Sequence, residues 1–199
     1  MNKKIVAFDF DGTITTKDTF PEFIRHAVGN VSFLAGFLCF MPQLIAYKLH
    51  LYPNWKVKEN LFSYFFSGMP KERFEALCES FFRLRGLNIL NKKACMTIRE
   101  HLCQGDTVLI VSASVSNWIR PFGSFLKVYD VIGTEVATDS SGNLTGKFLT
   151  PNCYGQEKVN RIKQLYPDYE SYIWVAYGDS IGDRELLDFA DYKYYNFFK

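Results

Sequence analysis

The chain lacks a strong excess of charge and any internal repeat. Its 23 Lys and Arg residues stand against 21 Asp and Glu residues, which leaves a net charge of only +2. Nucleic-acid-binding chains usually have a large basic excess on one face, so we expect no nucleic-acid partner. The absence of a repeated segment or low-complexity tract argues against a repeat architecture and favours an ordinary globular chain.

The chain also lacks the cysteine spacing of a disulfide framework or a zinc site. Its cysteines are odd in number, widely scattered and never spaced as CxxC. We expect them to be reduced residues that fill the core of a cytoplasmic protein. The N-terminal run MNKKIVAFDF has no signal-peptide pattern, which agrees with a cytoplasmic location. The five residues are Cys39, Cys78, Cys95, Cys103 and Cys153.

The chain does have the strand and helix alternation of an α/β protein. With 199 residues and 48% hydrophobic residues, it is long enough for one substantial core and a small appended domain. Buried-strand patterns lie at about 4–8, 108–114, 129–132 and 172–177, and the last strand falls within DYKYYNF. Helix patterns fall between them at about 88–103, 115–126 and 156–166, and after Gly182. We therefore predict a Rossmann-like, doubly wound parallel sheet.

Two interruptions of this alternation predict the domain organisation. Helix signals such as Asp18, Thr19, Pro53 and Pro70 recur between the first and second strands. We predict a helical cap domain over residues 17–84, inserted into a core domain made of 1–16 and 85–199. The stretch GTEVATDSSGNLTGKF alternates around a Ser-Gly-Asn turn and predicts a small β-hairpin that projects from the core.

Polar side chains end three of the predicted strands. Asp9 and Asp11 follow the first, VSAS ends the second, and GDSIGD with Asp179 and Asp183 ends a later one. In an extended chain, side chains two residues apart share one side, so the first pair faces one edge of the sheet. Open α/β sheets bind ligands at this carboxyl edge. Taken singly, each motif has a structural explanation: a turn, a helix N-cap, a first-turn acid, or for Lys158 a solvated helix lysine.

The four motifs DFDGT, VSAS, GQEK and GDSIGD, in this order, resemble those of the haloacid dehalogenase superfamily, and within it the phosphoserine phosphatase-like branch. The resemblance implies a phosphomonoester hydrolase in which Asp9 is the nucleophile that forms an aspartyl-phosphate. It implies that Asp11 is the general acid and base. It further implies that Ser112 and the amide of Ala113 hold phosphate oxygens and that Lys158 neutralises their charge. Dehalogenases of the superfamily lack the second aspartate, which favours phosphatase chemistry here.

An anionic nucleophile that approaches an anionic phosphate requires a cation. Two unit charges about 4 Å apart repel by roughly 4 kcal/mol at an effective dielectric near 20. Hard carboxylate and carbonyl oxygens without converging His or Cys residues suit Mg²⁺. By resemblance, Asp9 and Asp179 bind the metal directly and Asp11 adds its backbone carbonyl. Asp183 supports these ligands of the metal without contacting the ion itself.

The predicted cap decides the substrate, because it covers the sheet edge and contacts the leaving group. Asp18 stands where phosphoserine phosphatases have a glutamate that binds the substrate's amino group, although it is equally a helix-cap candidate. The arginine that binds the carboxylate in that branch has only candidate counterparts, Lys56, Lys58 and Arg73. The substrate is thus predicted only as a small-molecule phosphomonoester, and no oligomeric state is predicted.

The predicted cap also contains an uncharged run of about twenty residues, Ala27 to Tyr47. One interpretation is a pair of packed helices broken at Pro42, since Pro, Gly, Asn and Gln divide the run into pieces too short to span a bilayer. The other is an apolar surface that dips into a membrane, flanked by Arg25, Lys48, Lys56 and Lys58. Some relatives in this branch act on lipid head groups such as phosphatidylglycerophosphate, which makes a membrane-associated lipid phosphatase the alternative function. A non-catalytic binding module is the third.

Overall fold

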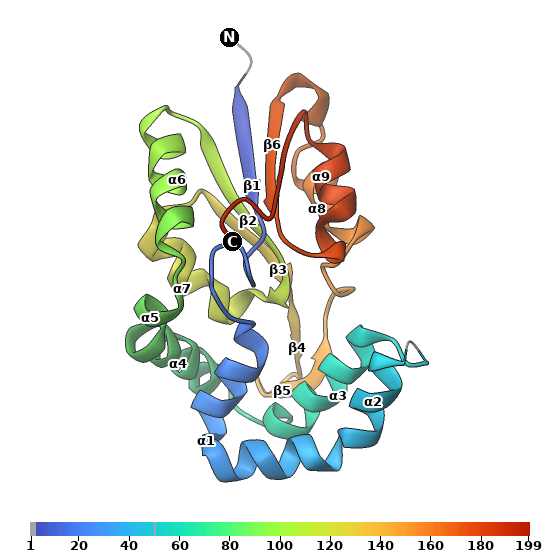
Figure 1. The fold of residues 1–199 in the computed structure, drawn as a ribbon. Coiled ribbons are helices and arrows are strands. Elements are labelled where there is room, and N and C mark those ends of the chain that lie inside the picture. Colours follow the sequence, from blue (N-terminus) through green and yellow to red (C-terminus); the bar gives the residue numbers. More distant parts are fainter. Residues whose placement is uncertain (1–2, 50) are drawn as a thin grey trace.

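A five-stranded parallel sheet forms the centre of the molecule (Figure 1). The computed structural model describes residues 3–49 and 51–199. The strand order is β3-β2-β1-β6-β7, with every neighbouring pair parallel. The strands are β1 (Lys4–Phe8), β2 (Thr107–Val115), β3 (Asp130–Thr134), β6 (Ile173–Gly178) and β7 (Tyr192–Tyr195). The three central strands are almost entirely buried because helices cover both faces, which explains their continuous hydrophobic runs.

Helices pack on both faces of this sheet, so the prediction of a doubly wound α/β fold is confirmed. On one face lie α6 (Lys92–Cys103) and α7 (Ser116–Leu126), which bury residues such as Ile98 and Trp118 against the sheet. On the other face lie α8 (Gln156–Leu165) and α9 (Arg184–Phe189), which bury Ile162 and Leu186. Short 3₁₀ turns, Tyr169–Ser171 and Ile181–Asp183, precede β6 and α9.

A helical segment between β1 and β2 lies beyond the carboxyl edge of the sheet (Figure 1). It contains α1 (Thr19–Cys39), α2 (Met41–Lys48), α3 (Asn54–Phe66), α4 (Lys71–Phe81), a π-helical stretch (Phe82–Gly86) and α5 (Leu87–Ile89). Stacked and edge-on aromatic rings fill its interior, with Phe23 in contact with Phe66, Phe74 and Phe81. A bridge between Thr15 and Leu90 brings the two ends of the segment together at the sheet.

The predicted β-hairpin is present and packs against the helical segment. Its strands, β4 (Val136–Thr138) and β5 (Leu144–Phe148), pair antiparallel in a separate two-stranded sheet. The Glu59 carboxylate on α3 accepts a hydrogen bond from the Phe148 amide at 3.0 Å and lies 3.2 Å from Lys147 Nζ. The hairpin therefore holds α3 through these two contacts.

Several helix boundaries differ from the predicted ones for identifiable reasons. α6 begins at Lys92 rather than near residue 88, because the Asn91 side chain accepts hydrogen bonds from two amides of its first turn. α1 contains a kink at Gly29, whose φ of +79° is not helical. The break between α1 and α2 falls at Phe40, so that Pro42 lies in the first turn of α2, where its missing amide hydrogen costs nothing.

Two further predictions concern cysteines and the uncharged run. All five cysteines are free, but Cys39 and Cys103 are exposed, so the expectation that they fill the core is wrong for these two. In the described part of the chain, no single helix has the length and apolar character needed to cross a membrane. α1 and α2 meet that test only as a pair, and they are bent by 62° relative to each other.

Candidate active site

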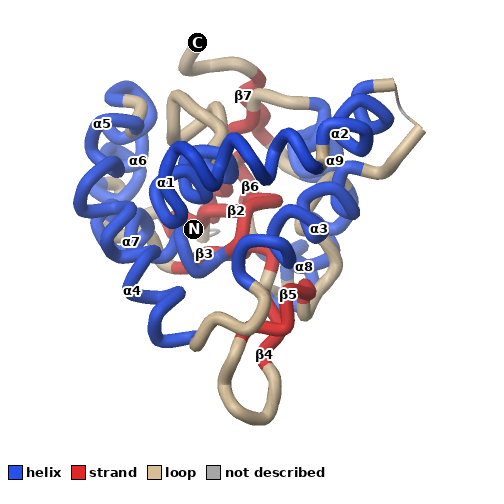
Figure 2. Tube along the Cα trace, turned by 90° about the horizontal axis from the view of Figure 1, so that it is seen from below, coloured by secondary structure: helices blue, strands red, loops and turns tan. Residues whose placement is uncertain are grey.

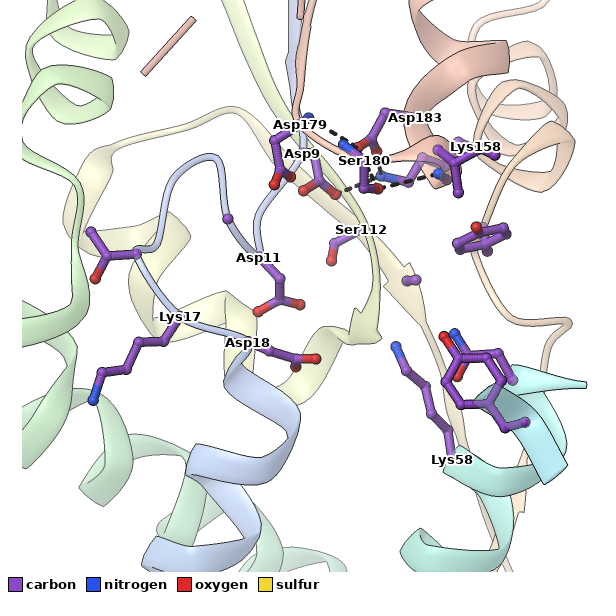
Figure 3. A pocket seen from close by; sticks show the side chains of 18 residues that line it. Asp9, Asp11, Lys17, Asp18, Lys58, Ser112, Lys158, Asp179, Ser180 and Asp183 are labelled. Atoms are coloured by element: carbon purple, nitrogen blue, oxygen red, sulfur yellow. Dashed lines mark hydrogen bonds and ion pairs between the residues drawn. The ribbon is translucent and has the colours of Figure 1, made fainter. Parts of the chain in front are cut away.

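A cavity of about 440 Å³ lies between the carboxyl edge of the sheet and the helical segment. Figure 3 shows side chains converging on it from the ends of β1, β2 and β6 and from α1, α3 and α8. Every residue that the sequence motifs indicated lines this cavity: Asp9, Asp11, Asp18, Ser112, Ala113, Lys158, Asp179 and Asp183. The structure therefore brings together side chains that are up to 174 positions apart, from Asp9 to Asp183.

The innermost part of the cavity is a buried ion-pair triad. The Lys158 ammonium donates hydrogen bonds to Asp9 Oδ1 and to Asp183 Oδ1, each at 2.6 Å. Lys158 is 1% exposed, so it is not the solvated helix lysine that its motif alone allowed. Burial raises the pKa of Asp9 to about 8, with the Asp183 and Asp11 carboxylates adding to the rise and Lys158 opposing it. The site thus contains more negative than positive charge.

Asp183 organises the loop after β6. Its Oδ2 accepts hydrogen bonds from the amides of Asp179 and Ser180 and from the Ser180 hydroxyl, at 2.9 to 3.1 Å. Burial alone would raise the pKa of Asp183, but Lys158 and these donors outweigh it and hold the pKa below its usual value. Both carboxylate oxygens of Asp183 are therefore already occupied by protein donors.

Asp179 lines the same cavity, and its carboxylate oxygens have fewer hydrogen-bond partners than those of Asp183. Its Oδ1 accepts a hydrogen bond from the Thr13 hydroxyl at 3.3 Å, and its Oδ2 lies 3.0 Å from Lys199 Nζ. Lys199 is largely exposed, so this ion pair is readily exchanged with solvent cations. No hydrogen bond to Asp9 Oδ2 occurs among residues 3–49 and 51–199.

The donor chemistry fits a hard divalent cation. One carboxylate oxygen each from Asp9, Asp179 and Asp183 lies within 4.8 Å of the others. Magnesium prefers one or two carboxylates, several waters and substrate oxygens, rather than a complete protein cage. Asp9 and Asp179 have oxygens available for such an ion, whereas Asp183 is positioned to hold the loop and Lys158. Gly12 provides the space beside Asp179, since a Cβ there would overlap the carboxylate.

Asp11 is held in one orientation by three donors. Its Oδ1 accepts from the Thr19 amide at 2.7 Å and the Thr19 hydroxyl at 2.6 Å, and its Oδ2 accepts from the Ser114 hydroxyl at 2.5 Å. Burial raises the pKa of Asp11, and the nearby Asp18 carboxylate adds to the rise, while the hydrogen bonds from Ser114 and Thr19 oppose it. A raised pKa favours the protonated carboxyl, which is the form that a general acid needs.

The end of β2 contributes small groups to the cavity wall. Ser112 and Ala113 line it, and the Ser112 Oγ accepts a hydrogen bond from the Ser114 amide at 3.1 Å. The Ala113 carbonyl accepts a hydrogen bond from the Thr134 hydroxyl at 3.0 Å, which holds the end of β2 against β3. A hydroxyl and a short side chain thus form this part of the cavity wall.

The helical segment supplies the opposite wall. Asp18 is the N-cap of α1, because its Oδ1 accepts from the Phe20 amide at 2.9 Å, and it also lines the cavity. Figure 3 shows Lys58 extending from α3 toward the cavity, whereas Lys17 points away and lies 3.4 Å from Glu22. Of the three candidate cap cations, only Lys58 lines the cavity.

Sequence reasoning missed several residues of this site. Ser114 was expected only as a helix N-cap candidate, although its hydroxyl holds Asp11; its spacing from Ser112 on one side of an extended strand could have indicated it. Thr19 was expected only as a helix-cap candidate, although it holds Asp11. Tyr47 and Asn54 carried no signal because their place depends on how the helical segment approaches the sheet, and Tyr154 carried none because it lies in the loop between β5 and α8. These three also line the cavity.

Comparison with known proteins agrees with the motifs. The family model for haloacid dehalogenase-like hydrolases matches residues 6–188. Protein CicA of Caulobacter vibrioides is 34% identical over 197 residues, which cover 98% of this chain and 86% of the relative. A histidinol-phosphatase of Neisseria meningitidis is 28% identical over 97 residues, which cover 46% of this chain and 44% of that protein.

Solved structures share the fold at low sequence identity. A protein of unknown function from Bordetella pertussis Tohama I superposes with a TM-score of 0.82 at 20% identity, over 94% of this chain and 87% of that one. A phosphoserine phosphatase solved as a phospho-aspartyl intermediate analogue superposes with a TM-score of 0.68 at 19% identity, over 97% of this chain and 86% of that one. At sequence identities of 20% and 19%, these similarities show a shared fold and nothing further.

Proposed function

The chain belongs to the haloacid dehalogenase-like hydrolase family, and from this premise we propose that it is a Mg²⁺-dependent phosphomonoester hydrolase that acts through an aspartyl-phosphate on a small-molecule phosphate. The observation that carries the proposal is the buried Asp9, which holds Lys158 through one oxygen and faces the cavity that Asp11 also lines. The phosphoserine phosphatase solved as a phospho-aspartyl intermediate analogue supports the same chemistry on this fold.

In the first step, a carboxylate oxygen of Asp9 attacks phosphorus and the bond from phosphorus to the ester oxygen breaks. Asp11 gives its proton to the departing alkoxide, which leaves as an alcohol. In the second step, Asp11 takes a proton from water, the water oxygen attacks phosphorus, and the acyl-phosphate bond breaks to restore Asp9 and release phosphate. Ser112 and the Ala113 amide hold phosphate oxygens, and Lys158 offsets their charge.

Asp9, Asp179 and the Asp11 carbonyl would hold Mg²⁺, and Asp183 would keep Asp179 and Lys158 in place. When bound, the ion would supply positive charge that offsets the repulsion between the Asp9 carboxylate and the phosphate. Its affinity for the site depends on this carboxylate set, so Asp179→Asn should raise the Mg²⁺ concentration needed for activity.

The test is hydrolysis of an aryl phosphate with Mg²⁺ and with a chelator. We expect Asp9→Asn to abolish turnover while the folded structure is retained, because an amide cannot act as the nucleophile. Acid-quenched wild-type protein should contain a hydroxylamine-sensitive phosphoryl adduct that Asp9→Asn lacks. Asp188→Asn, which changes an exposed carboxylate on α9, is the matched control and should behave as wild type. A wild-type rate in Asp9→Asn would refute the proposal.

Two other functions were open from the sequence. A non-catalytic binding module is disfavoured. Such a module would not need the buried Asp9, its ion-pair partner Lys158 and the hydrogen-bonded Asp11 carboxyl in one cavity. A lipid head-group phosphatase is the second candidate, and the exposed apolar side chains of α1 and α2 favour it. That observation is developed below.

A further inference from the structure

Two apolar stripes on α1 and α2 face solvent. On α1, Val31, Leu34 and Leu38 follow the i, i+3, i+7 spacing of one helix face, and their exposed fractions are 85%, 59% and 57%. On α2 and its C-cap, Met41, Ile45 and Leu49 repeat at four-residue intervals and are also exposed. We call these six residues the outer face. Figure 2, seen from below, shows α1 crossing this end of the molecule toward α2.

The outer face is not a misplaced core surface. The opposite sides of the same helices already pack inward, through Phe33, Phe37, Phe40 and Leu44 against the main hydrophobic cluster. The exposed apolar side chains therefore lie on a side of these helices that the core does not use. Contiguous exposed apolar patches of this kind usually mark an interaction surface.

The charged side chains in the stretch of chain that carries the outer face are of one sign. Residues 23–58 contain Arg25, Lys48, Lys56 and Lys58 and no Asp or Glu. Arg25 lies 4.7 Å from the centre of the Phe33 ring, and Lys56 lies 5.4 Å from that of the exposed Trp55. Lys58 differs from the flanking position expected from the sequence, because it turns into the cavity. An apolar face bordered by cations and aromatic rings complements an anionic interface.

The helices that carry the outer face also contribute to the wall of the active-site cavity. Tyr47 lines the cavity from α2, on the side of the helix opposite Ile45 and Leu49. Asn54 and Lys58, at the start of α3, line it as well. A surface that covers the outer face would therefore be separated from the cavity by the thickness of α2.

We propose that the outer face docks onto an anionic lipid bilayer, and that the substrate is a phosphomonoester presented at that surface. The proposal rests on the phosphohydrolase chemistry above and assigns to it the second candidate substrate class, a lipid head-group phosphate, in place of a soluble small molecule. The apolar stripes enter the boundary between head groups and acyl chains, and the flanking cations bind lipid phosphates.

A second copy of this chain is the less favourable occupant. An isologous contact would pair this surface with an identical one, whose charged side chains within residues 23–58 are also all cations. Like charges directly opposed across an interface are unfavourable. The anionic bilayer satisfies both the apolar and the cationic part of the surface.

The experiment is co-sedimentation of the whole chain with phosphatidylcholine vesicles, with or without phosphatidylglycerol. We expect binding that requires phosphatidylglycerol and weakens as salt is added, because screening reduces the lysine contribution. The double variant Leu34→Ser/Leu38→Ser should lower the partition coefficient by at least about tenfold, because it removes exposed apolar contact area. Lys48→Glu/Lys56→Glu should lower it by at least about tenfold as well.

Matched controls change the same residue types elsewhere. Leu87→Ser/Leu165→Ser alters two exposed leucines on α5 and α8, and Lys92→Glu/Lys93→Glu alters two exposed lysines on α6. Both controls should bind vesicles as wild type does. All variants should hydrolyse a soluble aryl phosphate at the wild-type rate, which shows that they are folded.

Three results would overturn the proposal. Wild-type protein that hydrolyses the aryl phosphate but does not bind phosphatidylglycerol vesicles would refute docking alone. Equal binding by the Leu34→Ser/Leu38→Ser variant and its control would refute the outer face. A wild-type dimer that becomes a monomer in this variant would assign the face to a second copy. Vesicle binding without aryl phosphatase activity would instead refute the proposed function and leave the docking surface standing.

Discussion

Gly12 lies so close to Asp179 that no side chain fits between them. A Cβ on Gly12 would lie 2.8 Å from Asp179 Cγ and 2.9 Å from its Oδ1, distances that real Cβ atoms do not show. The φ of Gly12 is also +86°, a conformation that other residues rarely adopt. The glycine of the DFDGT motif is thus required twice, by the turn and by the carboxylate.

Gly12→Ala should displace Asp179 and weaken Mg²⁺ binding. We expect the Mg²⁺ concentration for half-maximal activity to rise by at least about tenfold, since groups that orient metal ligands typically contribute 10–100-fold to affinity. Gly142→Ala is the control, because Gly142 has a φ of +81° but nothing within 4 Å of the added Cβ. If both variants needed the same raised Mg²⁺ concentration, backbone strain rather than overlap with Asp179 would explain the effect.

Lys158→Met should destabilise the chain strongly, because Asp9 and Asp183 would face each other without a cation. Removing one partner of a buried ion pair typically costs about 3–5 kcal/mol. Urea unfolding in a chelator measures the effect, and Lys163→Met on the exposed side of α8 should cost no more than about 0.5 kcal/mol. Adding Asp9→Asn to Lys158→Met should recover part of the loss. Additive costs of the two changes would contradict the coupling.

The triad also illustrates what the sequence can and cannot predict. The alternation of strands and helices predicted the parallel sheet, and the motifs at the strand ends indicated Asp9, Asp179 and Asp183, because each lies where its own strand stops. Lys158 was separated from a surface lysine only by resemblance, since helix periodicity says nothing of an ion pair across 149 residues. Lys58 was not distinguishable from Lys56, because its direction depends on how α3 rests on the hairpin.

Asp11 should lose catalytic power when its donors are removed. Thr19→Val keeps the backbone donor but removes the hydroxyl, and Ser114→Ala removes the only hydrogen bond to Asp11 Oδ2 within the described residues. We expect each change to lower kcat by about tenfold to hundredfold with little change in KM, because a misdirected acid transfers its proton poorly. Ser116→Ala removes a hydroxyl that donates to Glu135 and should leave kcat unchanged. A change confined to KM would argue against this role of the donors.

Lys58 should decide whether a second negative charge on the substrate is accepted. Within the described residues, Lys58 makes no ion pair and lies 5.9 Å from the centre of the Phe20 ring. Lys58→Met should raise KM by about tenfold for a phosphomonoester whose alcohol carries another phosphate or carboxylate, since charged hydrogen bonds contribute about 1.5–3 kcal/mol. KM for an uncharged aryl alcohol should not change. Lys56→Met, which alters an exposed lysine, should affect neither substrate, and an equal effect of both variants would exclude this role.

The raised pKa of Asp9 should make the metal-free protein less stable as pH rises. The pKa of Asp9 is about 8 in the folded chain and near 3.8 when exposed, so between these values the folded state binds a proton that the unfolded state has lost. The contribution of Asp9 to stability is complete below about pH 4 and is lost as pH rises through about 8. Asp183 has a lowered pKa, so its contribution is lost only as pH falls below about 4, outside this window.

Unfolding in a chelator should therefore occur at progressively lower urea concentrations between about pH 5 and pH 8. Asp9→Asn should reduce this dependence to the part of the same sign that the raised pKa of Asp11 contributes, and saturating Mg²⁺ should reduce it in the wild type by favouring the ionised carboxylate. Parallel pH profiles for the wild type and Asp9→Asn would place the titrating group elsewhere.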